Sequence, residues 1–176
     1  MALITNLISY WKLDEASGTI LDSHGSNNGT NTGASYGAAG KISNALDFES
    51  TESDRVVVAD TLDLRLTGNE FSIAFWIKVE SNVGATNRII NKDDGNDTTA
   101  GYSLYLESGS GYFTWSMQAT GAHNWQTTWI PTNGAWHYVV VVFKKDTERR
   151  LYVDGTSHST STDYAFNMAG EADDPL

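Results

Sequence analysis

The feature that most constrains this chain is an alternation of apolar and polar side chains with a period of two residues. In the segment FSIAFWIKV, every second residue from Phe71 to Val79 is apolar. Successive side chains of a β-strand point to opposite faces of a sheet, so this pattern predicts a strand with one buried face. A helical repeat is not sustained over more than about ten residues anywhere in the chain. The sequence therefore predicts an all-β protein.

Further segments with strand composition are separated by loops rich in Gly, Asn, Ser, Thr and Asp. Residues 136–143 are apolar at nearly every position, which favours a central strand covered on both faces. The Asp154-Gly155 pair is typical of a tight hairpin turn. Many short strands predict a two-sheet antiparallel β-sandwich. The predicted strands are 7–13, 45–49, 55–59, 71–79, 88–91, 102–107, 112–118, 136–144 and 149–153.

Size and charge limit the class of protein. The chain has 176 residues, which is close to the size of one domain, so a single domain over residues 1–176 is expected. The net charge of −11 argues against nucleic acids and anionic membranes as partners. Cysteine is absent, which excludes disulfides and thiolate chemistry. The sequence contains no long apolar run and no signal-peptide pattern, so membrane insertion is not expected.

The loop at residues 22–30 combines oxygen-bearing side chains with glycines. Asp22, Asn27 and Asn28, with neighbouring carbonyl groups, offer the oxygen ligands that Ca²⁺ prefers, so they form a candidate calcium site. The alternative is that Asp22 caps a turn and the asparagines adopt left-handed backbone conformations. A second acidic loop at 91–97 lacks EF-hand spacing and is expected to be solvated. The four histidines are not spaced as zinc ligands.

The loop at residues 123–129 places two indoles beside polar side chains. Sugar rings stack on exposed aromatic faces, while their hydroxyl groups seek hydrogen bonds. The alternative is that the indoles of this loop fill the open side of the sandwich. The tryptophans at 11, 76 and 136 lie within strand patterns and are expected in the core. The candidate carbohydrate site consists of Trp115, His123, Asn124, Trp125 and Trp129.

Several short motifs follow one another along most of the chain. They are YWKLDE at 10–15, the loop 22–30, NALDF at 44–48, the strand at 71–78, GYSL at 101–104, WHYV at 136–139 and LYVDG at 151–155. Together they resemble a laminin-G-like jelly-roll domain of the concanavalin-A-like lectin/glucanase superfamily. The resemblance implies two packed, curved antiparallel sheets in secreted, cell-surface or virion proteins that bind glycans or other proteins. It also implies a structural calcium in the loop at Asp22.

The resemblance departs from the family at the carboxyl end. Related domains usually continue beyond a Pro-Leu like that at 175–176 into closing strands. A missing strand leaves unpaired backbone groups along a sheet edge, which favours pairing with another chain. Three alternatives are open: a truncated chain, a natural variant with altered edges, and strand exchange between chains. Truncation or a segment supplied by a partner is favoured.

Catalysis is not expected, because the Glu-x-Asp-x-x-Glu motif of related glucanases is absent. The sequence thus predicts a non-catalytic module that binds carbohydrate on a cell, matrix or virion surface, with calcium as its expected cofactor. The predicted location is extracellular or on a virion. The alternative is a structural or protein-interaction module of a surface or phage tail assembly, completed by strand pairing with another chain or in a homo-oligomer.

Overall fold

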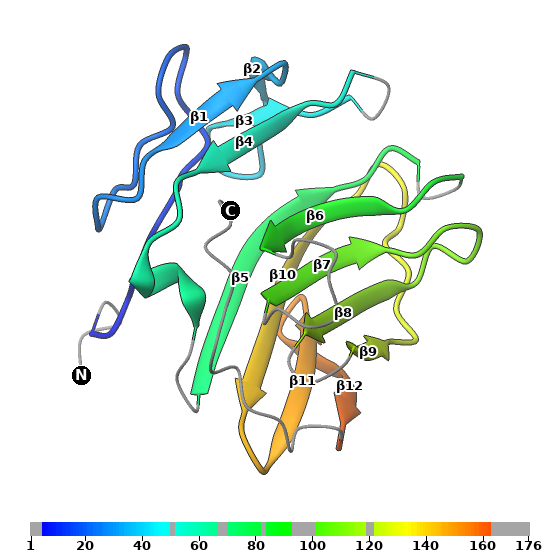
Figure 1. Ribbon diagram of the computed structural model, residues 1–176. Coiled ribbons are helices and arrows are strands. Elements are labelled where there is room, and N and C mark those ends of the chain that lie inside the picture. Colours follow the sequence, from blue (N-terminus) through cyan, green and yellow to red (C-terminus); the bar gives the residue numbers. More distant parts are fainter. Residues whose placement is uncertain are drawn as a thin grey trace. The chain divides into compact units, whose positions relative to one another are not determined.

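The computed structural model describes residues 5–49, 52–66, 70–81, 84–92, 101–118 and 122–162. Within these ranges the regular structure is β-strand apart from one 3₁₀ turn, η1 (Leu62–Arg65) (Figure 1). This confirms the predicted all-β class. The acidic loop from residue 93 onward and the predicted open edge near the carboxyl end lie outside the described residues. No helix in the described ranges is long and apolar enough to span a membrane.

The chain forms two compact units, of which unit 1 runs to Leu64 and unit 2 begins at Arg65. In unit 1, β1 (Gly29–Thr32) pairs with β4 (Arg55–Val58), and β2 (Ser35–Ala39) pairs with β3 (Asn44–Asp47), both antiparallel. The core of unit 1 consists of the buried Ile20, Ala34 and Leu46, against which Trp11, Leu13, Tyr36 and Val56 pack. Folding as a single domain stays a prediction.

The predicted strand at 7–13 is wrong. Trp11 forms only an isolated bridge with Asp22, and the other residues of this segment extend no ladder. Leu13 adopts a φ of 59°, in the left-handed region, which is incompatible with an extended strand. Trp11 and Leu13 therefore pack against the core of unit 1 from an irregular chain, whereas Leu7, Ile8 and Tyr10 are exposed.

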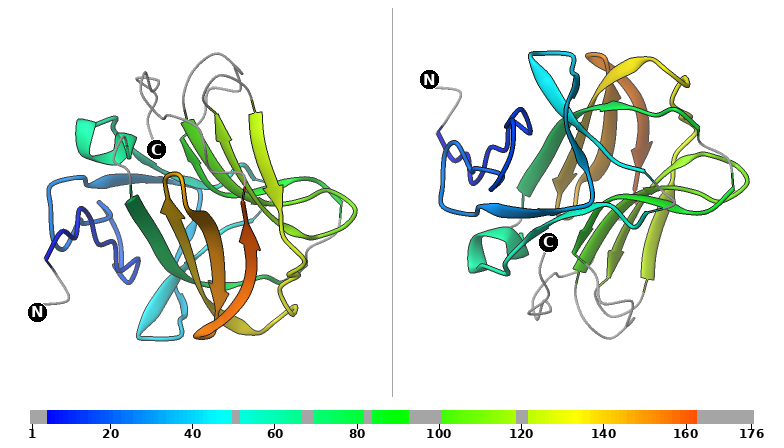
Figure 2. Two further views of the ribbon diagram at one scale, coloured as in Figure 1. Left: turned by 90° about the horizontal axis from the view of Figure 1, so that it is seen from below. Right: turned by 90° about the horizontal axis from the view of Figure 1, so that it is seen from above.

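Unit 2 contains two four-stranded antiparallel sheets, which Figure 2 shows as separate layers. One has the order β12-β11-β10-β5, with β5 (Glu70–Lys78), β10 (Trp136–Lys144), β11 (Glu148–Val153) and β12 (Thr156–Ser161). The other has the order β6-β7-β8-β9, with β6 (Asn87–Lys92), β7 (Gly101–Leu106), β8 (Phe113–Gln118) and β9 (Ala122–Gln126). The predicted antiparallel sandwich is confirmed.

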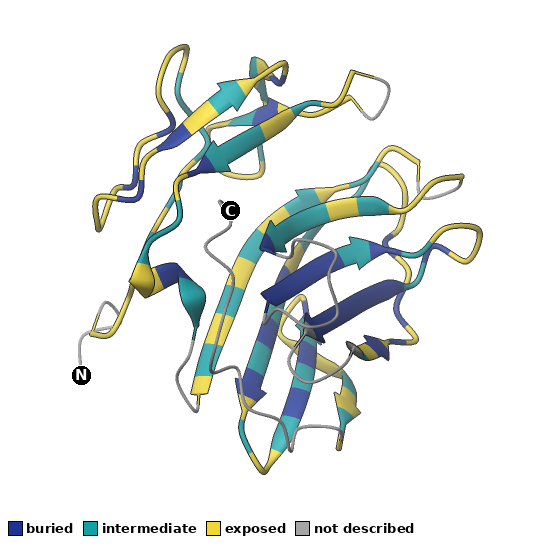
Figure 3. Ribbon diagram, in the orientation of Figure 1, coloured by how far each residue is buried: buried dark blue, intermediate teal, exposed yellow. Residues whose placement is uncertain are grey.

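Ring contacts join the facing layers of unit 2. The ring centroid of Phe71 on β5 lies 6.5 Å from that of Tyr102 on β7 and 6.0 Å from that of Trp115 on β8. Along β5, half-buried and exposed residues alternate over the whole strand (Figure 3). The half-buried set starts at Phe71, so the sequence alternation correctly identifies the face of β5 that meets the core.

Candidate functional site

The structure places the tryptophans of the predicted sugar-binding loop in the core of unit 2. Trp115 is 0% exposed, Trp125 8% and Trp129 6%. Trp115 and Trp125 are cross-strand partners on β8 and β9, with ring centroids 6.2 Å apart. The Arg149 guanidinium lies 5.6 Å from the centroid of Trp125, and its Nη1 donates to the carbonyl oxygen of His123 at 2.8 Å. These contacts leave little indole surface for a ligand.

Trp129 is held in the same core by its backbone and its ring. The Phe113 N–H donates to the Trp129 carbonyl at 2.9 Å, and the two ring centroids are 5.8 Å apart. The prediction that Trp115, Trp125 and Trp129 are exposed is therefore wrong, because all three indoles pack inside the sandwich. Of the predicted set, Asn124 is exposed and His123 is half-buried. Ligand binding by this loop stays a prediction.

The loop at residues 22–30 is organised around the Asp22 carboxylate. Asp22 Oδ1 accepts backbone N–H groups of Tyr10 at 2.9 Å, His24 at 3.0 Å and Gly25 at 2.9 Å. Asp22 Oδ2 accepts the Asn27 N–H at 3.1 Å. A Cβ atom on Gly25 would lie 2.7 Å from Asp22 Oδ2, so this close approach requires glycine. Four backbone donors therefore converge on one side chain.

The two asparagines continue this network. Asn28 Oδ1 accepts the Asp22 N–H at 2.8 Å, and Asn27 Oδ1 accepts the Thr61 hydroxyl at 3.0 Å. Asn27 Nδ2 donates to the Ser9 hydroxyl at 2.7 Å. The side-chain oxygens expected to bind calcium thus face hydrogen-bond donors. In this arrangement the residues fit a hydrogen-bonded turn and do not fit a calcium shell, which needs six to eight oxygens directed at the ion.

The environment of Asp22 also sets its charge. Burial alone would raise the pKa of this carboxyl, but the hydrogen bonds from the Tyr10, Gly25 and His24 backbone and from the Ser9 hydroxyl outweigh burial and hold the pKa well below its usual range. Among the described residues, no three His, Asp or Glu side chains gather in a group that could hold a metal ion. Calcium binding at Asp22, Asn27 and Asn28 stays a prediction from the sequence.

A different surface of unit 2 presents exposed aromatic rings. Trp76 on β5 and Tyr138 on β10 are cross-strand partners, each 38% exposed, with ring centroids 5.1 Å apart and planes inclined by 42°. The adjacent pair on this face is Lys78 and Trp136, with the Lys78 Nζ 5.8 Å from the Trp136 centroid. We call these four residues the aromatic face. By strand alternation, this face lies on the side of its sheet opposite the core.

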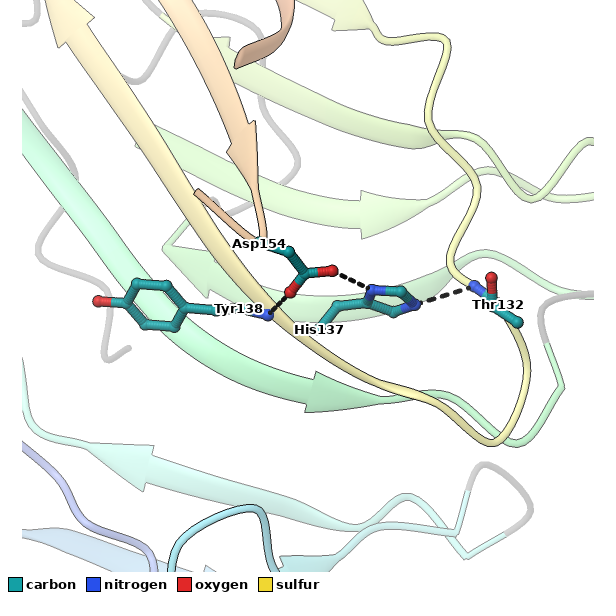
Figure 4. A network of polar contacts seen from close by, with 4 residues as sticks. All are labelled: Thr132, His137, Tyr138 and Asp154. Carbon is teal, nitrogen blue, oxygen red and sulfur yellow. Dashed lines mark hydrogen bonds and ion pairs between the residues drawn. The ribbon is translucent and has the colours of Figure 1, made fainter. Parts of the chain in front are cut away.

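A polar network positions the strand that carries Tyr138 (Figure 4). Asp154, in the turn between β11 and β12, accepts the Tyr138 N–H through Oδ1 at 2.9 Å, and its Oδ2 lies 2.8 Å from His137 Nδ1. The Thr132 N–H donates to His137 Nε2 at 3.3 Å. Because Nε2 acts as an acceptor, the proton of the neutral imidazole sits on Nδ1 and is donated to Asp154. The side chains of Asp154 and His137 thus connect the turn between β11 and β12 and the loop at Thr132 to β10 through hydrogen bonds.

The sequence expectation for two of these residues is wrong. Trp76 and Trp136 were expected in the core, but both lie on the aromatic face, where Trp76 is exposed and Trp136 is half-buried, whereas Trp11 packs against the core of unit 1. The signal was present in the pattern itself, because Trp76 lies between Phe75 and Ile77, which point inward. A strand places neighbours on opposite faces, so Trp76 must point outward. The size and hydrophobicity of the Trp76 indole favoured a core position, whereas the alternation along the strand indicated the outward face.

Solved structures with a similar fold come from toxins and from one domain of an enzyme. The binding domain of Paraclostridial Mosquitocidal Protein 1 has a TM-score of 0.74 at 16% identity, covering 97% of this chain and 43% of that chain. A structure of botulinum neurotoxin type C, whose cell entry depends on two ganglioside molecules, has a TM-score of 0.66 at 17% identity, covering 93% and 40%. The chain therefore spans less than half the length of these two toxin chains.

A third similar structure is domain 4 of AbnA, a GH43 extracellular arabinanase from Geobacillus stearothermophilus, in complex with arabinotriose. Its TM-score is 0.61 at 19% identity, covering 84% of this chain and 70% of that chain. At sequence identities of 16%, 17% and 19%, these structural similarities show that the fold is shared. No curated protein sequence matches the chain significantly.

The family is shown by the sequence profile of the concanavalin A-like lectin/glucanases superfamily, which matches residues 50–176. The match covers more than half of the chain, and it includes the strands of unit 2 that form the sandwich. It confirms the resemblance drawn from the short motifs. The chain belongs to the concanavalin A-like lectin/glucanases superfamily.

Proposed function

We propose that this chain is a non-catalytic, extracellular binding module that recognises carbohydrate through the aromatic face of unit 2. The observation that carries the proposal is the exposed pair of Trp76 and Tyr138 on neighbouring strands. Single exposed apolar residues are ordinary on protein surfaces. Two large rings in contact, held on the rigid strands of a sheet, instead form a continuous platform.

The chemistry of such a platform suits sugars. A pyranose or furanose ring presents C–H groups on its faces and hydroxyl groups around its edge. The C–H groups pack on aromatic rings, and the Tyr138 hydroxyl and the Lys78 ammonium lie at the rim as hydrogen-bonding groups. The rings are placed before any ligand arrives, because both come from paired strands and β10 is fixed by Asp154. Preorganisation of this kind reduces the entropy lost on binding.

Two of the similar structures support a saccharide ligand. Domain 4 of AbnA was solved with arabinotriose, and the type C neurotoxin interacts with gangliosides, whose head groups are saccharides. The arabinanase is also described as extracellular, which supports the same location for this chain.

The proposal is tested by binding of the full chain to a panel of immobilised oligo- and polysaccharides, followed by affinity measurements on the best ligand. Trp76→Ala and Tyr138→Ala should each weaken binding by at least about tenfold, equivalent to about 1.4 kcal/mol. The matched control is Tyr10→Ala, because Tyr10 is an exposed aromatic residue of unit 1, outside the aromatic face. Unchanged affinity in both Trp76→Ala and Tyr138→Ala would reject the aromatic face as the site.

A further inference from the structure

The outward face of the sheet β12-β11-β10-β5 carries three cations that differ in their partners. Lys144 pairs with Glu70, with its Nζ 3.4 Å from Glu70 Oε1, and Arg150 pairs with Glu148. The contact seen for the Lys78 ammonium is the face of Trp136, at 5.8 Å from the centroid. Among the described residues, no carboxylate lies within ion-pair distance of Lys78. Within the part of the chain that the structure describes, this cation therefore contacts an aromatic ring and forms no ion pair.

The position of Lys78 relative to the exposed rings is set by the strand register. Lys78 pairs with Trp136 across the strands, and Trp76 pairs with Tyr138 one step along the same face. Residues two apart on a strand are separated by about 6.5 Å, and directly opposed residues by about 5 Å. By this backbone spacing, Lys78 lies about one sugar ring along the face from the exposed pair.

From this juxtaposition we infer that the ligand of the aromatic face is an acidic saccharide. Its ring stacks on Trp76 and Tyr138, and its carboxylate pairs with Lys78. This inference rests on the proposed carbohydrate-binding function and adds the charge of the ligand. The chain as a whole carries a net charge of −11 and repels anions at long range. Selectivity for an acidic sugar therefore has to come from a short-range contact, and Lys78 supplies that contact at the platform.

The test uses pairs of saccharides that differ only in the acid group, within the same panel of neutral and acidic sugars. Suitable probes are an oligogalacturonate with its methyl ester and sialyllactose with the methyl ester of its sialic acid carboxylate. The full native chain should bind at least one acidic member about tenfold or more tightly than its neutral counterpart. Lys78→Gln should abolish this preference by weakening binding of the acidic member about tenfold more than binding of its neutral counterpart, and Lys78→Arg should retain the preference.

The matched control is Lys144→Gln, which removes a cation from the same sheet face but leaves the aromatic pair untouched. Lys78 and Lys144 are exposed, so neither substitution should disturb the fold. Thermal melts of both variants would check that each variant folds. Equal affinity for acidic and neutral members, or a preference that persists in Lys78→Gln, would overturn the acidic-ligand inference. If Trp76→Ala still abolishes binding in that case, the proposed function stands. Absence of binding to every saccharide in the panel would overturn both.

Discussion

At the scale of single residues, Asp22 shows how one side chain can fix an irregular segment. Its carboxylate accepts four backbone N–H groups within a loop that has few ladder hydrogen bonds. The sequence indicated that Asp22 was structurally important, but it could not distinguish a cation from converging amides. Both explanations use the same oxygen-rich composition, and only the direction of the neighbouring donors separates them.

Replacing Asp22 with Asn should destabilise the protein by about 2 kcal/mol, because a buried charged acceptor loses its charge and one of its two oxygens becomes a donor facing an N–H group. Urea unfolding of the full chain measures this change. Asp63→Asn is the matched control, since Asp63 is exposed. Equal stability of Asp22→Asn and the native chain would contradict the role given to this carboxylate.

The lowered pKa of Asp22 also predicts how the stability of the protein depends on pH. The folded-state pKa of Asp22 lies below its unfolded value of about 3.9, so its stabilising contribution is complete above that pH. The contribution is lost as the pH falls below about 4 toward the folded-state pKa. The stability difference between the native chain and Asp22→Asn should therefore be constant near neutrality and shrink in acid. A difference that grows as the pH falls would have the wrong sign.

Calcium should not stabilise the protein through this loop, because the Asp22 and asparagine oxygens face hydrogen-bond donors. Thermal melts with added calcium and with a chelator should therefore coincide. A melting temperature that rises with calcium in the native chain, but not in Asp22→Asn, would establish the calcium site predicted from the sequence.

At the scale of elements, apolar strands were predictable and polar strands were not. The predicted range 136–144 coincides with β10, and 71–79 is displaced by one residue from β5. In contrast, β1, β2, β9 and β12 fall in predicted loops, because none of them contains Val, Ile, Leu or Phe. For example, β12 reads TSHSTS and is extended because it pairs with β11 after the Asp154-Gly155 turn. Such pairing between strands is not encoded in local hydrophobicity.

Asp154 offers a test at this scale, because it joins the turn between β11 and β12 to β10. An Asn at position 154 has only one acceptor oxygen, so Asp154→Asn loses the hydrogen bond from either the Tyr138 N–H or the His137 Nδ1–H, at a cost of about 1 kcal/mol. Asn tolerates the positive φ of 50° at this position, so backbone strain is not introduced. Asp146→Asn, in the turn before β11 with a φ of 57°, is the control. Equal urea midpoints for the two variants would contradict the network.

At the scale of the whole molecule, the fold and family were accessible from the sequence, but the location of the candidate site was not. The order of the motifs identified the superfamily, and strand alternation identified the core face of β5. The indoles of the 123–129 loop were assigned to the surface because a Gly- and Asn-rich context resembles solvent-exposed loops. Their burial depends on long-range contacts with Phe113, Arg149 and His137, which no local pattern reveals.

The length of the chain predicts a single cooperative domain, which unfolding experiments can examine. Urea transitions of the full chain followed by tryptophan fluorescence and by far-ultraviolet circular dichroism should coincide. Two separated transitions would instead show that the unit up to Leu64 and the unit from Arg65 unfold independently.

Carbohydrate binding by the aromatic face is tested most directly by nuclear magnetic resonance of the six tryptophan indole N–H groups during titration with the best saccharide from the panel. The signals of Trp76 and Trp136 should shift with ligand concentration, and those of the buried Trp115 and Trp125 should stay in place. Shifts confined to Trp125 and Trp129, or a saccharide that binds without moving the Trp76 signal, would contradict the proposed site.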